Sequence, residues 1–138
     1  MPDISKKLTP IFKKYPVICA YLFGSRATGK IRAISDFDIA IFFDWKMDKK
    51  KRDSLAYNIK EEIEEKLKAY KNVDIVPLND AQPLLEHEIV YKGKRIYSGD
   101  DSARAHYEAR AISRWLDWKF HQDKHDKAVK EQMGKPVS

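Results

Sequence analysis

The feature that most constrains the fold is a run of seven apolar residues, 17–23, which stops abruptly at Gly24 and Ser25. A continuous apolar run of this length is typical of a β-strand that is covered on both faces. Residues 37–43 predict a second strand of the same kind. The chain is therefore expected to build a small sheet with helices packed on both sides.

Carboxylates mark the beginning of the second strand. Side chains alternate between the two faces of a strand, and the odd-numbered side chains of residues 37–43 are all apolar. The even-numbered face begins with Asp36 and Asp38. Residues 73–76 predict a third strand, and Asp74 lies within it. If this strand neighbours the second one, Asp74 joins the other two carboxylates.

Helices are predicted around these strands. Apolar residues recur at helical spacing in residues 4–15, in 53–70, from about 82 to 91, and from about 101 to 121 or beyond. Residues 94–97 predict a short edge strand. Strands and helices that alternate in this way favour an α+β fold of α/β-like character, with a small mixed sheet covered by helices.

Length and composition set further limits. With 138 residues, one domain is expected at 1–122, followed by a Lys-rich tail at 123–138 that frays. No apolar run approaches the ~20 residues of a membrane span. The single cysteine, Cys19, excludes an internal disulfide, and the N-terminus lacks a signal-peptide core, so a cytoplasmic protein is expected. The net charge of +6 suits a phosphate-bearing ligand or an acidic partner without deciding between them.

The segment after the first strand combines groups that suit a polyphosphate. Gly24 can adopt a positive φ and allow close approach to a ligand, and Ser25 can cap a following helix and donate a further hydrogen bond. Three cations follow in the same loop, namely Arg26, Lys30 and Arg32. The segment is not a Walker A motif, because no Gly-Lys-Ser/Thr follows at the required spacing.

The carboxylates predict a metal site. Asp36 and Asp38 on one face would repel each other, and a divalent cation offsets that repulsion. Ligand sets made only of oxygen favour Mg²⁺ or Mn²⁺. With Asp74 added, the set can hold two ions, of which one orients a triphosphate and the other activates an attacking hydroxyl.

One family shows this combination. Gly-Ser-x10-Asp-x-Asp with a later strand Asp resembles the signature of the polymerase-β-type nucleotidyltransferase superfamily, and the short chain resembles its minimal nucleotidyltransferases (MNT). The signature is carried by Gly24, Ser25, Asp36, Asp38 and Asp74. Residues 85–97 and the long helix after them are similar to MNT antitoxins of HEPN/MNT toxin–antitoxin pairs.

The resemblance implies an activity and a partner. It implies transfer of AMP from ATP, with release of pyrophosphate, to a tyrosine hydroxyl of a HEPN ribonuclease toxin, which is silenced within a hetero-oligomer. Gly24 and Ser25 would then bind the nucleotide phosphates, with Arg26 and Lys30 as nearby cations. Two Mg²⁺ ions would be bound by Asp36 and Asp38, while Asp74 would bind the catalytic ion and help to deprotonate the acceptor.

Two other functions stay open. The chain could neutralise its toxin by stable binding and occlusion, with vestigial carboxylates. It could instead modify a small molecule such as an antibiotic, although such enzymes usually carry more acceptor-binding structure than 138 residues allow.

Two surface features each allow two interpretations. A basic cluster at residues 46–52 is expected in a loop, either solvated or docking an acidic partner, and no direct nucleic-acid binding is expected. The last helix has a wider apolar sector than one core-facing stripe needs, which fits core packing or a partner surface anchored by Arg110 and Arg114.

Overall fold

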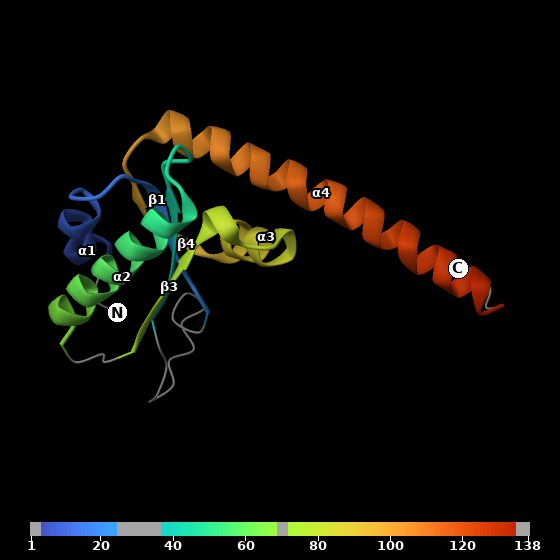
Figure 1. The fold of residues 1–138 in the computed structure, drawn as a ribbon, viewed down its shortest axis with the longest axis horizontal. Coiled ribbons are helices and arrows are strands. Elements are labelled where there is room, and N and C mark those ends of the chain that lie inside the picture. The colour runs from blue at the N-terminus through green and yellow to red at the C-terminus, as the bar shows by residue number, and fades with distance from the viewer. Residues whose placement is uncertain (1–3, 25–36, 69–71, 135–138) are drawn as a thin grey trace.

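The chain folds into a mixed α+β structure, represented by a computed structural model that describes residues 4–24, 37–68 and 72–134 (Figure 1). Its elements in chain order are α1 (Ile4–Phe12), β1 (Val17–Phe23), β2 (Phe37–Phe43), α2 (Lys49–Lys66), β3 (Val73–Pro77), the short 3₁₀ helix η2 (Leu78–Asp80), α3 (Pro83–Lys92), β4 (Lys94–Ser98) and α4 (Asp101–Gln132). The three strands predicted before residue 80 and the short strand after it are all present.

The sheet is mixed, with the strand order β3-β2-β1-β4. β1 pairs antiparallel with both β2 and β4, whereas β2 and β3 run parallel. The parallel pair is joined by α2, as a crossover between parallel strands requires. The predicted fold class is thereby confirmed, including the edge position of β4.

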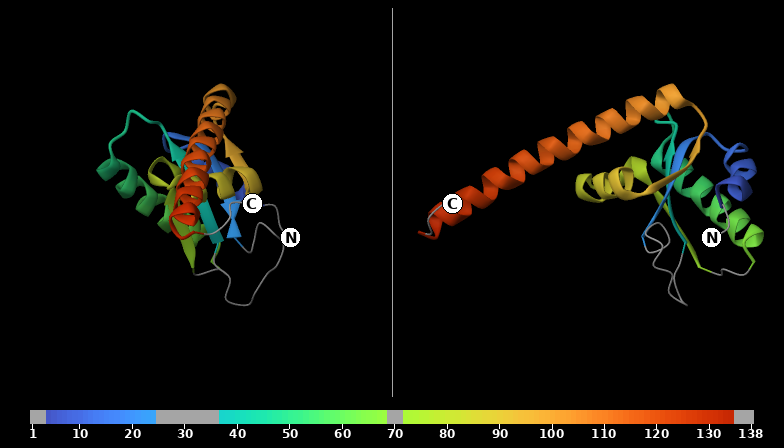
Figure 2. Two further views of the ribbon diagram at one scale, coloured as in Figure 1. Left: turned by 90° about the vertical axis from the view of Figure 1, so that its right-hand side faces the viewer. Right: turned by 180° about the vertical axis from the view of Figure 1, so that it is seen from behind.

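Helices cover both faces of this sheet, and each face has its own core (Figures 1 and 2). The odd-numbered side chains of β2 pack with α1 and α2, as the alternation predicts. Ala40 and Phe42 face the other way and pack with α3 and the first half of α4. In this second core the Phe42 and Tyr107 rings stack with their centroids 3.8 Å apart.

Helix α2 begins one turn earlier than the sequence predicts. Asp48 caps its N-terminus by accepting a hydrogen bond from the backbone N–H of Lys51. The basic cluster expected in a loop therefore lies partly in the first turns of α2, which corrects that prediction. Arg52 in particular is not solvated: its side chain is 12% exposed and forms an ion pair with Asp80.

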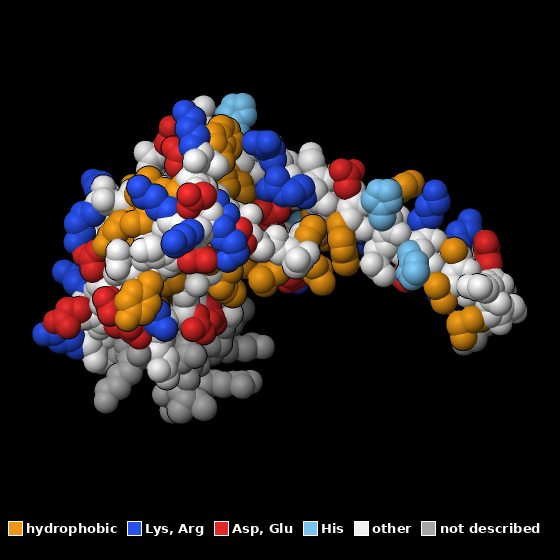
Figure 3. Space-filling view, viewed as in Figure 1, with side chains coloured by type: hydrophobic (Ala, Val, Ile, Leu, Met, Phe, Trp, Pro, Cys, Tyr) orange, Lys and Arg blue, Asp and Glu red, His pale blue; other side chains and the backbone are white. Residues whose placement is uncertain are grey.

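Helix α4 is long and projects away from the sheet (Figures 1 and 2). The segment predicted to fray after residue 122 continues as helix to Gln132, although every described residue from 119 to 134 is exposed. The wide apolar sector of this helix is divided. Tyr107 and Ala111 are buried, whereas Ile112, Leu116 and Phe120 are exposed. Figure 3 shows hydrophobic side chains on the surface along this helical arm. Among the described helices, none is both long and apolar enough to cross a membrane.

Candidate active site

Gly24 directly follows β1, and its backbone takes a conformation that favours glycine. Its φ is +76°, in the left-handed region that side-chain-bearing residues rarely adopt. A Cβ atom at this position would lie 2.4 Å from Oδ2 of Asp38. The positive φ is the conformation that the sequence predicts, and the group packed against this glycine is the Asp38 carboxylate.

Asp38 and Asp74 lie side by side on neighbouring strands. They are register partners in the parallel pairing of β2 with β3, whose backbones are about 4.8 Å apart. Partners of this kind project to the same face, which here is the face covered by α3 and α4. Asp38 is partly buried and Asp74 is exposed. The strand neighbourhood that Asp74 needs in order to join Asp38 is therefore present.

The strand directions gather these three residues at one end of the sheet. β1 ends at Phe23, which pairs with Asp38 near the start of β2. Because β3 runs parallel to β2, its start lies at the same end. Gly24, Asp38 and Asp74 thus occupy a single edge although the sequence separates them widely.

The chemistry of this pair fits a hard divalent cation. Carboxylate oxygens are the ligands that Mg²⁺ prefers, and two carboxylates on adjacent strands repel each other unless a cation lies between them. Within the described part of the chain, no group of three or more His, Cys, Asp or Glu side chains is placed to hold a metal ion. The pair therefore fits an ion that takes its remaining ligands from outside these residues.

Several predicted site residues lie outside the described residues. They are Ser25, Arg26, Lys30, Arg32 and Asp36. Of the predicted site, the structure therefore places Gly24, Asp38 and Asp74, and it brings all three together. The roles of all these residues, described or not, stay predictions.

A small cavity next to Asp74 adds residues that the sequence did not single out. It has a volume of about 240 Å³ and lies between α2 and β3. Tyr57 and Lys60 line it together with Asp74. A hydrogen bond to Glu61 raises the pKa of Tyr57. The only signal in the sequence was that both residues lie beside the buried stripe of α2, and nothing there indicated that this side of the helix would adjoin β3.

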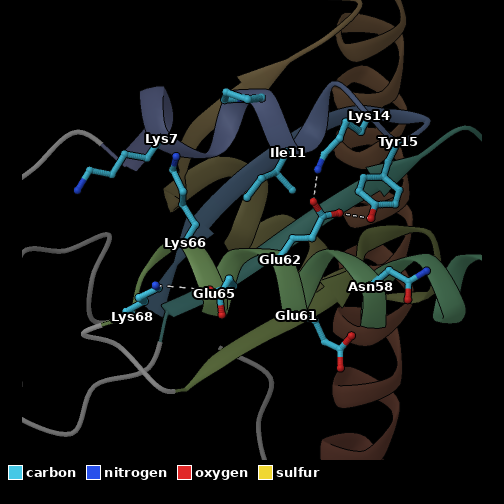
Figure 4. A pocket seen from close by; sticks show the side chains of 11 residues that line it. Lys7, Ile11, Lys14, Tyr15, Asn58, Glu61, Glu62, Glu65, Lys66 and Lys68 are labelled. Atoms are coloured by element: carbon cyan, nitrogen blue, oxygen red, sulfur yellow. Dashed lines mark hydrogen bonds and ion pairs between the residues drawn. The ribbon is translucent and has the colours of Figure 1, made fainter.

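A larger cavity lies between α1 and α2, away from the carboxylate pair (Figure 4). Its volume is about 870 Å³, and side chains of both signs line it. Lys14 and Tyr15 both donate hydrogen bonds to Glu62 across this space. The bond to Glu62 raises the pKa of Tyr15 to about 12, and Lys14 lowers the pKa of Glu62. These groups hold α1 against α2 and contribute nothing to the edge that carries Asp38.

A buried carboxylate fastens α3 to α4. Glu86 is 2% exposed, and it accepts a hydrogen bond from the Tyr107 hydroxyl at 2.8 Å and two from the Arg114 guanidinium at 2.9 Å each. Burial raises the pKa of Tyr107, so its hydroxyl stays protonated and donates. Arg114, which the sequence suggested as a partner anchor, is therefore engaged within the chain.

The fold thus combines a four-stranded mixed sheet with two register-matched carboxylates beside a strand-ending glycine. Residues 6–102 match the family described as polymerase beta, nucleotidyltransferase. The match spans all four strands together with Gly24, Asp38 and Asp74. The chain belongs to this family, as the resemblance implied.

Two relatives have names that specify an activity. The protein adenylyltransferase MntA of Aphanizomenon flos-aquae (strain 2012/KM1/D3) is 36% identical over 86 residues, which cover 58% of this chain and 57% of that protein. The chain thus spans a little over half the length of this relative. MJ0435 of Methanocaldococcus jannaschii, provisionally named a protein adenylyltransferase, is 35% identical over 88 residues, which cover 64% of this chain and 88% of that protein.

Solved structures with the same fold come from toxin–antitoxin complexes. A chain of a toxin–antitoxin crystal structure with AMP-PNP matches with a TM-score of 0.65 at 22% identity, covering 94% of this chain and 98% of that chain. A chain from the complex of a tri-AMPylated Shewanella oneidensis HEPN toxin with an MNT antitoxin gives a TM-score of 0.58 at 22% identity, covering 93% and 97%. At this level of identity the likeness establishes the fold.

Proposed function

We propose that this chain is an antitoxin that transfers AMP from ATP to a tyrosine hydroxyl of a cognate HEPN ribonuclease toxin, and that the transfer silences the toxin. The observation that carries the proposal is the register pairing of Asp38 with Asp74 beside Gly24. The names of the two relatives and the tri-AMPylated toxin in one structural neighbour support it. The partner and the chain would form a hetero-oligomer in the cytoplasm.

The nucleotide would bind at the end of β1. Its phosphates would approach the backbone after Gly24 and the hydroxyl of Ser25, which can donate hydrogen bonds to them. Arg26 and Lys30 follow in the same loop and would compensate the charge of the triphosphate. The tight packing between Gly24 and Asp38 supports this placement, because phosphates bound to the backbone after Gly24 would lie beside a carboxylate that could share a cation with them.

The carboxylates would hold two Mg²⁺ ions. Asp36 and Asp38 would ligate both ions, and Asp74 would ligate the one nearer the acceptor. When bound, these ions would neutralise phosphate charge and lower the pKa of the acceptor hydroxyl. The alignment of Asp38 with Asp74 supports this donor set, since adjacent strands bring their oxygens within reach of a common cation.

The transfer step is an in-line displacement. The tyrosine oxygen forms a bond to the α-phosphorus of ATP, and the bond from that phosphorus to the bridging oxygen of pyrophosphate breaks. Asp74 takes the hydroxyl proton, and its exposed position leaves it open to an incoming tyrosine. Asp38, packed against Gly24, is the less exposed member of the pair.

A second candidate, neutralisation by binding alone, is favoured by one observation. Ile112, Leu116 and Phe120 expose a continuous apolar face on α4, which a partner protein could cover. The double variant Asp36→Ala with Asp38→Ala separates the two functions. If the variant still neutralises the toxin, binding suffices, whereas transfer as the neutralising step predicts that the toxin becomes active again.

The test of transfer is an intact-mass measurement. The purified chain is incubated with Mg²⁺, ATP and the HEPN protein encoded next to it, and the HEPN protein is then weighed. We expect the added mass of one or more AMP groups, lost in the double variant and carried by a tyrosine on fragmentation. A correctly folded pair that gains no AMP would refute the proposal.

A further inference from the structure

A third cavity lies at the opposite end of the sheet from Gly24. Its volume is about 330 Å³, within the usual range of small-molecule sites. Phe42 of β2 and Trp45, which follows β2, line it together with residues from α2, η2, α3 and α4. Phe42 is four residues beyond Asp38 along β2, or about 13 Å, so this cavity is separate from the candidate active site.

Three arginines meet in this cavity although they come from distant parts of the chain. Arg52 belongs to α2, and Arg110 and Arg114 belong to α4. One member of the basic cluster, Arg52, thus lies in the same cavity as the two arginines of the last helix, which are distant from it in the sequence. Arginine forks are suited to phosphate and carboxylate groups, which they bind through paired hydrogen bonds.

The charges of the cavity do not balance. Arg52 is paired with Asp80 at 2.7 Å, and Arg114 is paired with Glu86 at 2.9 Å. Arg110 has no carboxylate within ion-pairing distance among the described residues. Arg52 also keeps a buried Nε without a hydrogen-bond partner. One positive charge is therefore left uncompensated in a site already rich in guanidinium donors.

An aromatic ring stands next to the uncompensated charge. Trp45 is 53% exposed, and the Arg110 guanidinium lies 5.3 Å from the centre of its ring. Exposed tryptophan offers a flat apolar face on which a planar group can stack. Asn79, whose side chain bonds the Phe43 backbone at 3.0 Å, fixes η2 against the end of β2 and so keeps the wall of the cavity in place.

We propose that this cavity binds a phosphate monoester, with the phosphate on the Arg110 guanidinium and the organic part over Trp45. Arg114 contributes through Nη1, since its Nε and Nη2 donate to Glu86. The ligand class follows from the excess positive charge, the fork geometry of Arg110 and the adjacent aromatic face. The proposal is independent of AMP transfer, since none of its residues belongs to the carboxylate edge.

The first experiment measures binding without divalent metal. Inorganic phosphate, ribose 5-phosphate and AMP are titrated into the full chain by calorimetry, in EDTA and at constant ionic strength. We expect saturable binding, weakened about tenfold or more in Arg110→Ala and unchanged in Lys119→Ala, which removes a cation from the same helix outside the cavity. Equal affinity in wild type and Arg110→Ala would overturn the proposal, as would the lack of saturable binding by all three probes.

The second experiment identifies the organic part. If the ligand is a nucleotide, AMP binds about tenfold more tightly than inorganic phosphate, and Trp45→Ala removes that difference. If the three probes bind alike and all depend on Arg110, the site recognises phosphate alone, which would contradict the place given to the organic part over Trp45. Circular dichroism of each variant verifies the fold. AMP binding that survives both Arg110→Ala and Trp45→Ala would place the nucleotide elsewhere and contradict the proposal.

Discussion

Gly24 does two things that no other residue type can do at its position. Its φ of +76° costs a side-chain-bearing residue roughly 1–2 kcal/mol. Its missing Cβ also leaves room for Oδ2 of Asp38, which a methyl group would meet at 2.4 Å. The glycine therefore sets the position of the carboxylate as well as the path of the chain after β1.

Replacing this glycine tests that dual role. Gly24→Ala should lower the free energy of unfolding by about 2 kcal/mol and reduce AMP transfer more than tenfold, because Asp38 must move. The matched control is Gly134→Ala, where φ is +70° and a Cβ would meet nothing within 4 Å. Urea titration and initial transfer rates measure both effects. Wild-type rates in Gly24→Ala would contradict the role given to this contact.

Cys19 offers a residue-scale test of the core. It is fully buried between the sheet and α4, and burial raises the pKa of its thiol to about 12. At pH 8 the native thiol should stay protonated and resist iodoacetamide. The thiol of the unfolded chain, with a pKa of about 8.5, should react. Mass spectrometry with and without urea reports the difference. Rapid alkylation of the native chain would show that this core opens.

At the scale of elements, the positions of the strands were easier to predict than the start of α2 or the order of the strands in the sheet. Residues 17–23 are continuously apolar, and residues 37–43 are apolar apart from Asp38, so both strands and the two faces of β2 could be predicted from local pattern. The start of α2 was placed late, because Asp48 was not recognised as its cap. Strand order depends on contacts between distant segments, which no local pattern encodes.

In the candidate site too, local sequence predicted some features, and others required the three-dimensional structure. Gly24, Asp38 and Asp74 were predicted from residue type and spacing, because a Gly-Ser that ends one strand, an Asp-x-Asp that opens the next and a third Asp within another strand occur together. Their proximity required the parallel register of β2 and β3. Glu86 gave no signal, because one carboxylate within an amphipathic helix is indistinguishable from a solvated one until its partners Tyr107 and Arg114 are known.

The docking of α4 on α3 depends on that buried carboxylate. Glu86→Ala would leave the Tyr107 hydroxyl and the Arg114 guanidinium without their partner, and we expect the free energy of unfolding to fall by about 3 kcal/mol. Glu88→Ala on the same helix removes only a partly exposed ion pair with Lys92 and should cost less than about 0.5 kcal/mol. Similar losses in both variants, measured in urea, would contradict the role of Glu86.

At the scale of the whole molecule, the described chain is a compact sheet domain with a helical arm. The arm continues the helix that packs on the sheet, and its last turns touch none of the other described elements (Figure 1). Pairs such as Lys119 with Asp123 and Gln122 with Asp126 support it locally. The arm is therefore connected to the domain only through the continuous helix α4, and it does not pack on the other described elements.

Removing the arm should leave the domain intact. Deletion of residues 123–138 is expected to change the free energy of unfolding by less than about 0.5 kcal/mol, because the described residues in this range are all exposed. Helical signal in circular dichroism should fall, while the urea midpoint stays the same. A loss of several kcal/mol would show that the domain does not end near residue 122.

The central claim is that Asp74, which is paired in register with Asp38, takes the proton of the acceptor hydroxyl during AMP transfer. The most direct measurement is the initial rate of transfer to the toxin by Asp74→Asn, beside Glu65→Gln, which removes an exposed carboxylate from α2. We predict that Asp74→Asn loses a factor of about 100 or more with unchanged stability, while Glu65→Gln keeps the wild-type rate. Full activity in Asp74→Asn would contradict the account.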